Sequence, residues 1–291
     1  MVSAVADPAA VRVGVKAWAI WPAVLWTLVF FVLPLGAMLA LSFAERTGDR
    51  IVAWGSLANY RAFATLGDGT LVKALVNSIE VTIVVTVLSV VIAYPLAYIL
   101  AYRVPARWRR ALLVLIVLPF WTSYVVRSYS WLLVLSENGV LNAGLIGLGL
   151  IDTPIGMGNT RGATVLGFVH FFVMLLTLTI FANLVQIPDS YRRAAADLGA
   201  SRFQVFRHVT LPLSLPGVAT GAFLTFVLAI GDYITPQILG GSRELLLPQA
   251  IMLQVSRQAN FPMASALSMV LMLAVTAAFL VAAKRLRMER V

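Results

Sequence analysis

Six apolar stretches, each long enough to cross a lipid bilayer, dominate this sequence of 291 residues. The hydrocarbon core of a bilayer requires roughly 20 consecutive apolar residues in an α-helix. The stretches cover residues 18–42, 78–102, 111–135, 162–186, 213–233 and 264–283. We therefore expect an all-α polytopic membrane protein with six transmembrane helices, organised as a single transmembrane domain over residues 1–291.

The composition agrees with this interpretation, because 60% of the residues are hydrophobic, only 12% are charged and the mean hydropathy is +0.92. A soluble domain has about 25% charged residues. The first stretch is much longer than the roughly 7–15-residue apolar core of a secretory signal peptide, so we expect it to be retained as a membrane helix. Prolines lie in or beside several stretches and are either tolerated kinks or hinges of a gate: Pro34, Pro95, Pro119 and Pro216.

The net charge of +10 lies mainly in short tracts between the apolar stretches, which favours a topology signal over a nucleic-acid surface. With both termini on one side, that side carries fourteen Lys and Arg in 59 residues, and the other side carries seven in 91. The bias predicts that both termini and the segment 187–212 face the cytoplasm. On the opposite side, residues 138–150 are apolar enough for a short interfacial or re-entrant helix.

Several kinds of chemistry are missing from the sequence. It contains no G-x-x-x-x-G-K-[ST] loop, and the dipeptide Gly-Lys does not occur, so binding of ATP by that route is excluded. There is no cysteine, and the two histidines, His170 and His208, belong to no cluster with metal-ligand spacing. We therefore expect neither an enzyme nor a metal site nor a cofactor bound by this chain.

Two charged residues interrupt the apolar stretches. Arg127 lies in the third and Asp232 at the outer end of the fifth. Because an intramembrane charge is costly unless it faces protein or water, Arg127 either pairs structurally with a carboxylate or with helix-end carbonyls, or shapes a transport path. Asp232 is either a path residue or a solvated helix end, and His170 is expected to be packed and hydrogen-bonded. The aromatic residues nearby form either an interfacial belt or a path wall, so the candidate path residues are Trp121, Tyr124, Arg127, Tyr129, Asp232 and Tyr233.

The longest polar interruption in the second half of the chain is RRAAADLGASRFQVFRHVTLPLSLPG, residues 192–217. Asp189 or Ser190 is expected to cap a helix that ends at Gly199, and Ser201 to cap a second short helix. This second helix should stop at Leu211-Pro212, with Phe203 and Phe206 on one face. Two short helices of this kind suit docking into a soluble partner, and the alternative is a basic loop lying on anionic lipid.

This segment resembles the EAA loop of the permeases of ABC importers, whose pattern is Glu-Ala-Ala, three residues, Gly, nine residues and Ile-x-Leu-Pro. Ala194, Ala195 and Gly199 match, as do Val209 to Pro212. The stretches GDYITPQILGG, FWTSYVVRSYSW and ENGVLNAGLIGLGLIDTP resemble the spermidine/putrescine-type subfamily. Arg193 departs from the pattern, because the family has glutamate at this position. The residues that the resemblance assigns to ATPase coupling are Arg193, Ala194, Ala195, Asp197, Gly199, Phe203, Phe206 and Pro212.

The resemblance implies a type I ABC importer permease (MetI-like) fold in a bacterial inner membrane, with coupling helices at about 188–212. It further implies a cytoplasmic ATPase dimer that holds ATP and Mg²⁺, a second homologous permease, and a periplasmic substrate-binding protein. Polyamine is the substrate that the subfamily suggests. The alternatives are another small solute (amino-acid-like, opine, organic cation, phosphonate or iron), a stand-alone secondary transporter, or a structural scaffold.

Overall fold

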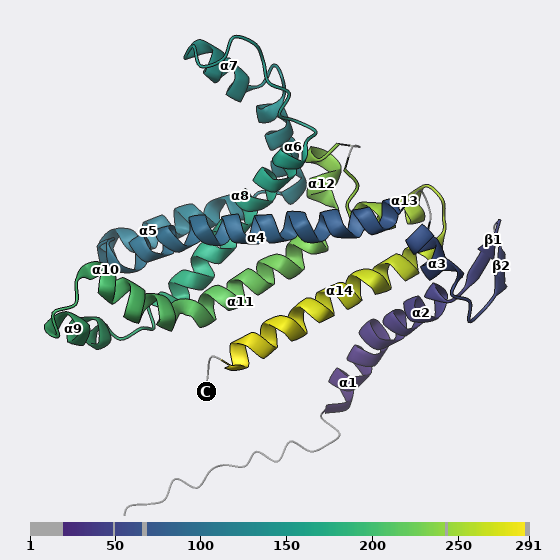
Figure 1. Ribbon diagram of the computed structural model, residues 1–291, viewed down its shortest axis with the longest axis horizontal. Coiled ribbons are helices and arrows are strands. Elements are labelled where there is room, and N and C mark those ends of the chain that lie inside the picture. The colour runs from purple at the N-terminus through teal and green to yellow at the C-terminus, as the bar shows by residue number, and fades with distance from the viewer. Residues whose placement is uncertain (1–19, 49, 66–68, 242–243, 289–291) are drawn as a thin grey trace, which may run out of the picture.

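The computed structural model describes residues 20–48, 50–65, 69–241 and 244–288, most of which are helical (Figure 1). Four of the cations behind the predicted orientation, Arg12, Lys16, Arg243 and Arg290, lie outside these residues. The helices are α1 (Trp21–Thr27), α2 (Leu33–Ser42), α3 (Ala58–Thr65), α4 (Thr70–Tyr102), α5 (Ala106–Val117), α6 (Tyr124–Leu135), α7 (Val140–Gly147), α8 (Arg161–Leu184), α9 (Asp189–Asp197), α10 (Arg202–Val205), α11 (Leu211–Ile230), α12 (Ile234–Leu239), α13 (Leu247–Ser256) and α14 (Phe261–Met288). Strands β1 (Glu45–Thr47) and β2 (Arg50–Ala53) pair in an antiparallel hairpin, with Thr47 opposite Arg50.

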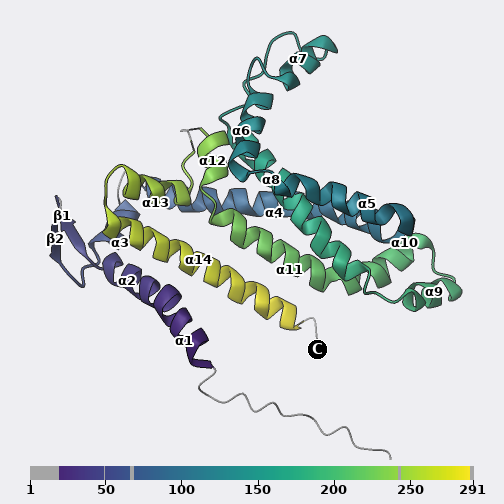
Figure 2. The same cartoon turned by 180° about the vertical axis from the view of Figure 1, so that it is seen from behind.

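The centre of the bundle is formed by α4, α8 and α11, which lie side by side in both views (Figures 1 and 2). One buried cluster includes Val85, Phe168 and Phe172, and another includes Ala97 and Ile180. The small alanines of α4 let the backbone of α8 approach closely. Small residues are common where membrane helices pack, because the hydrophobic effect does not drive helices together in lipid.

The first predicted span forms a helical run, Trp21–Ser42, that lies beside α14 and has almost no buried side chains (Figure 1). Along this run Trp21, Phe31 and Leu33 are each at least 60% exposed. A surface of large apolar side chains on this scale suits lipid rather than water.

The third predicted span, 111–135, is broken into two helices beside Pro119, where the sequence predicted a kink or a hinge. The chain forms α5, then the 3-10 turn η3 (Leu118–Trp121), and then α6. The two helical parts, Ala106–Trp121 and Tyr124–Gly147, are bent by 91° relative to each other. Pro119 cannot donate a backbone hydrogen bond, and Thr122 and Ser123 are extended with ψ of 146° and 133°, so the helix ends there.

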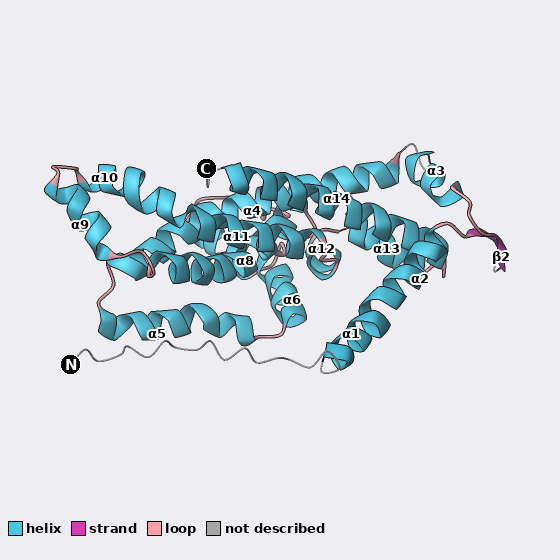
Figure 3. Ribbon diagram, turned by 90° about the horizontal axis from the view of Figure 1, so that it is seen from below, coloured by secondary structure: helices cyan, strands magenta, loops and turns pink. Residues whose placement is uncertain are grey.

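Five helical runs in the described ranges are long and apolar enough to cross a membrane, and counting the bent pair as one span gives six. The α6–α7 part projects away from the other helices (Figures 1 and 2), and Figure 3 shows α9 and α10 at the opposite end of the molecule from the β-hairpin. Its short helix α7, Val140–Gly147, falls in the segment 138–150, where a short helix was predicted.

The start of α5 and the pair α9–α10 lie at one end of the bundle, although they are far apart in the sequence (Figure 1). Helices α3 and α13 and the β-hairpin lie at the other end. The basic loops 103–110 and 187–212 therefore share one end, as the alternation of spans predicts. This arrangement places the polar interruption of the sequence where a second protein has access to it.

Candidate functional site

Helix α9 forms the first part of the predicted coupling segment. The predicted cap by Asp189 or Ser190 is wrong, because Pro188 takes the N-cap position and no side chain caps the helix. Asp189 instead pairs with Arg192 at 3.1 Å and lies 3.8 Å from Arg193. These pairs form because residues three and four apart share one side of a helix.

The C-terminal end of α9 agrees with the sequence-based prediction. Gly199 has φ of 84°, a left-handed conformation that residues with a Cβ rarely adopt. Ser201 then caps α10 through a capping box: its hydroxyl accepts from the Gln204 backbone N–H, and the Gln204 side chain accepts from the Ser201 N–H at 2.7 Å.

The second predicted short helix does not stop at Leu211-Pro212. Instead α10 continues through the π-helical segment η4 (Phe206–Thr210) into α11, which gives one helical run from Arg202 to Ile230. The N–H of Leu211 bonds to the carbonyl of Phe206, five residues back. The wider turn accommodates Pro212, whose ring would otherwise clash with the preceding turn. The π-helical segment η2 (Leu28–Val32) precedes Pro34 in the same way.

Phe203 and Phe206 do not form a common exposed face, contrary to the prediction. Phe203 is 67% exposed, whereas the ring of Phe206 packs edge-on against Tyr94 and Tyr98 at 6.0 and 5.5 Å. Their exposure differs because the ring of Phe206 packs against α4, and helical spacing alone does not reveal this packing. The two most exposed large apolar side chains of the segment are therefore Phe203 and Leu198, which is 89% exposed.

The other residues that the resemblance assigns to coupling lie along α9 and η4–α11. Ala194 and Asp197 are exposed, Ala195 is partly buried, and Arg193 has a side chain that is 78% exposed. Pro212 is exposed at the start of α11.

Three tyrosines of α4 attach the coupling segment to the bundle, and none of them was among the coupling residues predicted from the sequence. Tyr94 is hydrogen-bonded to Ser214 at 2.9 Å, and Tyr102 donates to the carbonyl of Leu184 at 2.9 Å. The guanidinium of Arg192 lies 4.0 Å from the centre of the Tyr102 ring. The spacing of Tyr94, Tyr98 and Tyr102 by four residues was the available signal, because it places them on one side of a helix.

Arg127 is buried, with 9% exposure, and its guanidinium binds the end of the preceding helical turn. Its Nη2 donates to the carbonyl of Pro119 at 2.9 Å and to that of Thr122 at 3.0 Å. The carbon of the guanidinium lies 5.2 Å from the centre of the Phe171 ring. The prediction of a partner at helix-end carbonyls is thus confirmed, although Arg127 occupies the first turns of α6 and not the middle of a straight span.

Asp232 is held in a polar cluster with Tyr124 and Thr235. The Tyr124 hydroxyl donates to its carboxylate, the Thr235 hydroxyl donates at 2.8 Å, and the N–H of Ile234 donates at 2.8 Å. The simple solvated helix end is therefore excluded for Asp232. The cluster joins α6 to the end of α11 and the start of α12.

Of the six candidate path residues, the structure brings Tyr124, Arg127 and Asp232 together and leaves the other three exposed. Trp121, Tyr129 and Tyr233 are 85%, 54% and 38% exposed.

A cavity of about 270 Å³ lies beside Arg127 and includes Trp131 and His170 in its lining. The indole N–H of Trp131 donates to Nδ1 of His170 at 3.0 Å, which confirms the packed, hydrogen-bonded histidine predicted from the sequence. Nη1 of Arg127 is buried and has no hydrogen-bond partner. The cavity is thus mostly apolar and lies beside a buried guanidinium that has one unpaired nitrogen. Within the ranges that the structure describes, no three His, Cys, Asp or Glu side chains gather closely enough to hold a metal ion.

The structure defines the class of polytopic helical membrane proteins, with a polar two-helix segment at one end of the bundle. Residues 93–290 match the family model described as "Binding-protein-dependent transport system inner membrane component", and the chain belongs to this family. It is therefore a multi-pass inner-membrane permease of an ABC importer.

Curated relatives agree with this assignment. The chain is 31% identical over 244 residues to the "Spermidine/putrescine transport system permease protein PotB" of Haemophilus influenzae, covering 84% of each chain. It is 32% identical to the PotB of Escherichia coli over 58% of this chain and 62% of that protein. The "Inner membrane ABC transporter permease protein YdcU" of Escherichia coli is 36% identical over 54% of this chain and 53% of its own length.

Solved structures share the fold. A chain of a bacterial alginate ABC transporter, solved in complex with an alginate pentasaccharide-bound periplasmic protein, superposes with a TM-score of 0.73 at 16% identity and covers 91% of both chains. A chain of the MetNI methionine ABC transporter gives a TM-score of 0.56 at 17% identity and covers 75% of this chain and 95% of its own. The prediction of a type I, MetI-like importer fold is confirmed.

Proposed function

We propose that this chain is one of two permease subunits of an importer that takes up polyamines of the spermidine/putrescine type. The names of the PotB relatives, which are 31% and 32% identical to this chain, support this substrate class. A second permease is supported by a more distant relative, the "Spermidine/putrescine transport system permease protein PotC" of Haemophilus influenzae, at 29% identity over 43% of this chain.

The energy comes from a separate cytoplasmic ATPase dimer, which holds ATP and Mg²⁺ and docks on α9 and α10. A periplasmic binding protein delivers the substrate to the opposite end. The end of the bundle that carries α9 and α10 faces the cytoplasm, together with both termini, which follows from the distribution of Lys and Arg.

The observation that carries the proposal is the unbroken helical run from Arg202 to Ile230. A helix rises about 1.5 Å per residue, so this run of 29 residues spans roughly 43 Å. Closure of the ATPase displaces α10, and α11 transmits the displacement because no loop separates the two. At the far end, Asp232 and Tyr124 connect α11 to α6, so the bent α6–α7 part moves with it.

Arg193 occupies the position that glutamate has in the EAA loop, which this segment resembles. Its charge is opposite to that of the family residue, and the side chain is 78% exposed. In this importer it meets an acidic residue of its own ATPase or stays in solvent. The substitution Arg193→Glu distinguishes these cases, as developed in the Discussion.

A second candidate is an importer of the same class for a small solute that carries a carboxylate. The observation that favours it is the free Nη1 of Arg127 beside a cavity of about 270 Å³. A guanidinium attracts carboxylates and repels polyamines, and the carboxylate of Asp232 already accepts three hydrogen bonds from the protein.

The test is ATP-dependent uptake in proteoliposomes that contain the complete importer and its binding protein. Labelled spermidine and putrescine are compared with a basic amino acid and a dicarboxylate. Uptake of a polyamine supports the first candidate, and uptake of the dicarboxylate alone supports the second. Uptake that persists without the ATPase contradicts the importer proposal itself.

A further inference from the structure

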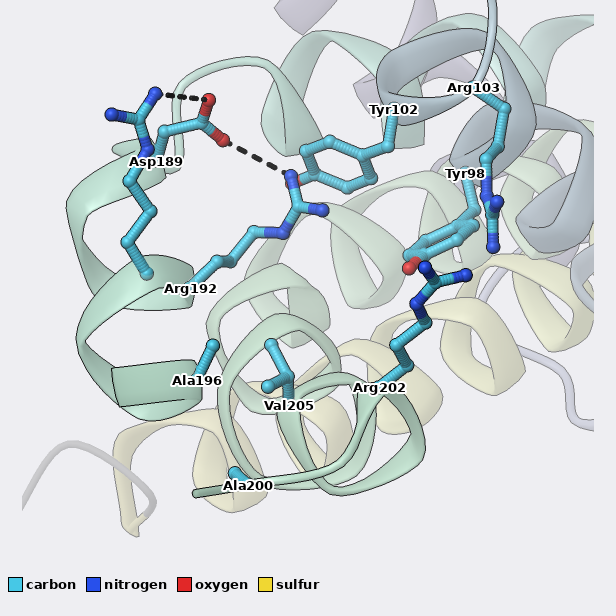
Figure 4. A pocket seen from close by; sticks show the side chains of 10 residues that line it. Tyr98, Tyr102, Arg103, Asp189, Arg192, Ala196, Ala200, Arg202 and Val205 are labelled. Carbon is cyan, nitrogen blue, oxygen red and sulfur yellow. Dashed lines mark hydrogen bonds and ion pairs between the residues drawn. The ribbon is translucent and has the colours of Figure 1, made fainter. Parts of the chain in front are cut away.

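An open cavity of about 510 Å³ lies between the C-terminal end of α4 and the pair α9–α10 (Figure 4). It is lined by four arginines and one carboxylate, which give a net charge of +3. These residues are Arg103, Arg192, Arg193, Arg202 and Asp189. We name this cavity the arginine pocket. A glutamate in place of Arg193 would lower its net charge to +1, so the unusual residue of the coupling segment makes the pocket more attractive for anions.

Arg192 is held in a fixed position within the arginine pocket. Its guanidinium stacks at 4.0 Å on Tyr102, and its Nη1 pairs with Asp189 at 3.1 Å (Figure 4). Tyr102 is itself anchored by the hydrogen bond to Leu184. The Nε of Arg192 is buried without a hydrogen-bond partner. The pocket therefore contains one guanidinium whose orientation is fixed by Tyr102 and Asp189.

Arg103 and Arg202 supply the uncompensated charge. Among the described residues neither has an ion-pair partner, whereas Arg192 and Arg193 both lie near Asp189. Figure 4 shows both guanidinium groups extending into the pocket near Tyr98. Planar guanidinium groups present pairs of N–H donors that match phosphate oxygens.

We propose that the arginine pocket binds a phosphate-bearing anion, either the phosphodiester headgroup of an anionic phospholipid or a free phosphate compound. The pocket lies at the C-terminal end of α4, a helix long enough to cross a membrane, and beside Tyr98 and Tyr102, and we infer from this position that it lies near the lipid headgroups. Basic pockets between membrane helices on the cytoplasmic side are suited to such headgroups.

The arginine pocket shares Arg193 with the surface proposed to meet the ATPase, but most of its lining lies outside that surface. The two most exposed apolar side chains of the coupling segment, Leu198 and Phe203, do not line the arginine pocket. A ligand there would link α9 to α4 and so set how freely the coupling segment moves. The inference does not depend on which solute the importer carries.

The test uses the purified full-length chain in a neutral detergent. Short-chain phosphatidylglycerol, short-chain phosphatidylcholine and inorganic phosphate are titrated separately, and dissociation constants are measured by native mass spectrometry. The double substitution Arg103→Gln/Arg202→Gln removes charge from the pocket and leaves the Arg192 stack in place. The matched control, Arg107→Gln/Arg207→Gln, removes two exposed arginines that do not line the pocket.

The wild type and the control are expected to bind phosphatidylglycerol, and the pocket variant to bind it at least tenfold more weakly, which corresponds to about 1.4 kcal/mol. Phosphate binding that weakens in parallel identifies a free phosphate compound as a ligand, and binding of phosphatidylglycerol without phosphate identifies the lipid. Equal weakening in both variants, or no anion binding by the wild type, overturns the proposal. Loss of ATPase co-purification in the pocket variant, without any lipid binding by the wild type, assigns the pocket to a protein partner instead.

Discussion

The Tyr124 hydroxyl connects α6 to the segment between α11 and α12, and the substitution Tyr124→Phe removes its hydrogen bonds to Asp232 and Thr235. Hydrogen bonds to charged groups contribute about 1.5–3 kcal/mol. Asp232 is partly exposed and keeps two other donors, from Thr235 and the N–H of Ile234. The expected loss is therefore at the lower limit, about 1.5 kcal/mol.

The free energy of unfolding is measured by titration of the purified chain with a denaturing detergent in mixed micelles. The matched control is Tyr129→Phe, five residues further along α6, where the side chain is 54% exposed. The control is expected to change the free energy of unfolding by less than about 0.5 kcal/mol, as is usual for surface substitutions.

A double-mutant cycle with Asp232→Ala isolates the pairwise contribution. If the two residues interact as the structure has them, the cycle gives a coupling energy of about 1 kcal/mol or more, whereas independent sites add within roughly 0.3–0.5 kcal/mol. Additive effects of Tyr124→Phe and Asp232→Ala would refute the connection between α11 and α6.

Three further predictions concern packing, capping and coupling. A Cβ at Gly221 would lie 2.7 Å from Leu176, so Gly221→Ala is expected to destabilise the chain by about 1–3 kcal/mol. The control Gly36→Ala should not destabilise it, because no atom lies within 4 Å of a Cβ there. Thermal unfolding of the two variants checks this difference. Ser201→Ala removes the capping box of α10 and is expected to cost about 1 kcal/mol, seen as faster amide exchange in α10 but not in α9. Arg193→Glu is expected to reduce the ATPase activity of the assembled complex strongly if Arg193 meets an acidic partner, and unchanged or increased activity argues against that partner.

Local signals in the sequence were sufficient to predict where the helices of the coupling segment end and begin near Gly199 and Ser201. Gly199 and Ser201 mark the end of one helix and the start of the next through conformation and capping, which depend on a few neighbouring residues. The apolar stretches likewise identify the membrane helices by length alone. The π-helical turn at Phe206–Thr210 was not predictable in this way, because Pro212 is compatible with either a stop or a widened turn, and the packing of Phe206 against Tyr94 and Tyr98 decides between them.

The third span and the arginine pocket show what the sequence could not supply. Pro119 indicated a bend, but the 91° angle depends on Thr122 and Ser123 being extended and on Arg127 binding the carbonyls thereby freed. The stack of Arg192 on Tyr102 joins residues 90 positions apart, and no periodicity connects them.

The central claim is that the helical run through α10 and α11 transmits movement from an ATPase to the membrane path. The most direct measurement is the amount of solute imported per ATP hydrolysed when three glycines are inserted between Thr210 and Leu211, with the same insertion after Gly149 in an exposed loop as the control. The account predicts that the first insertion leaves ATP hydrolysis in place and reduces import to background, while the control imports normally. Import at the wild-type ratio with the helix interrupted would contradict it.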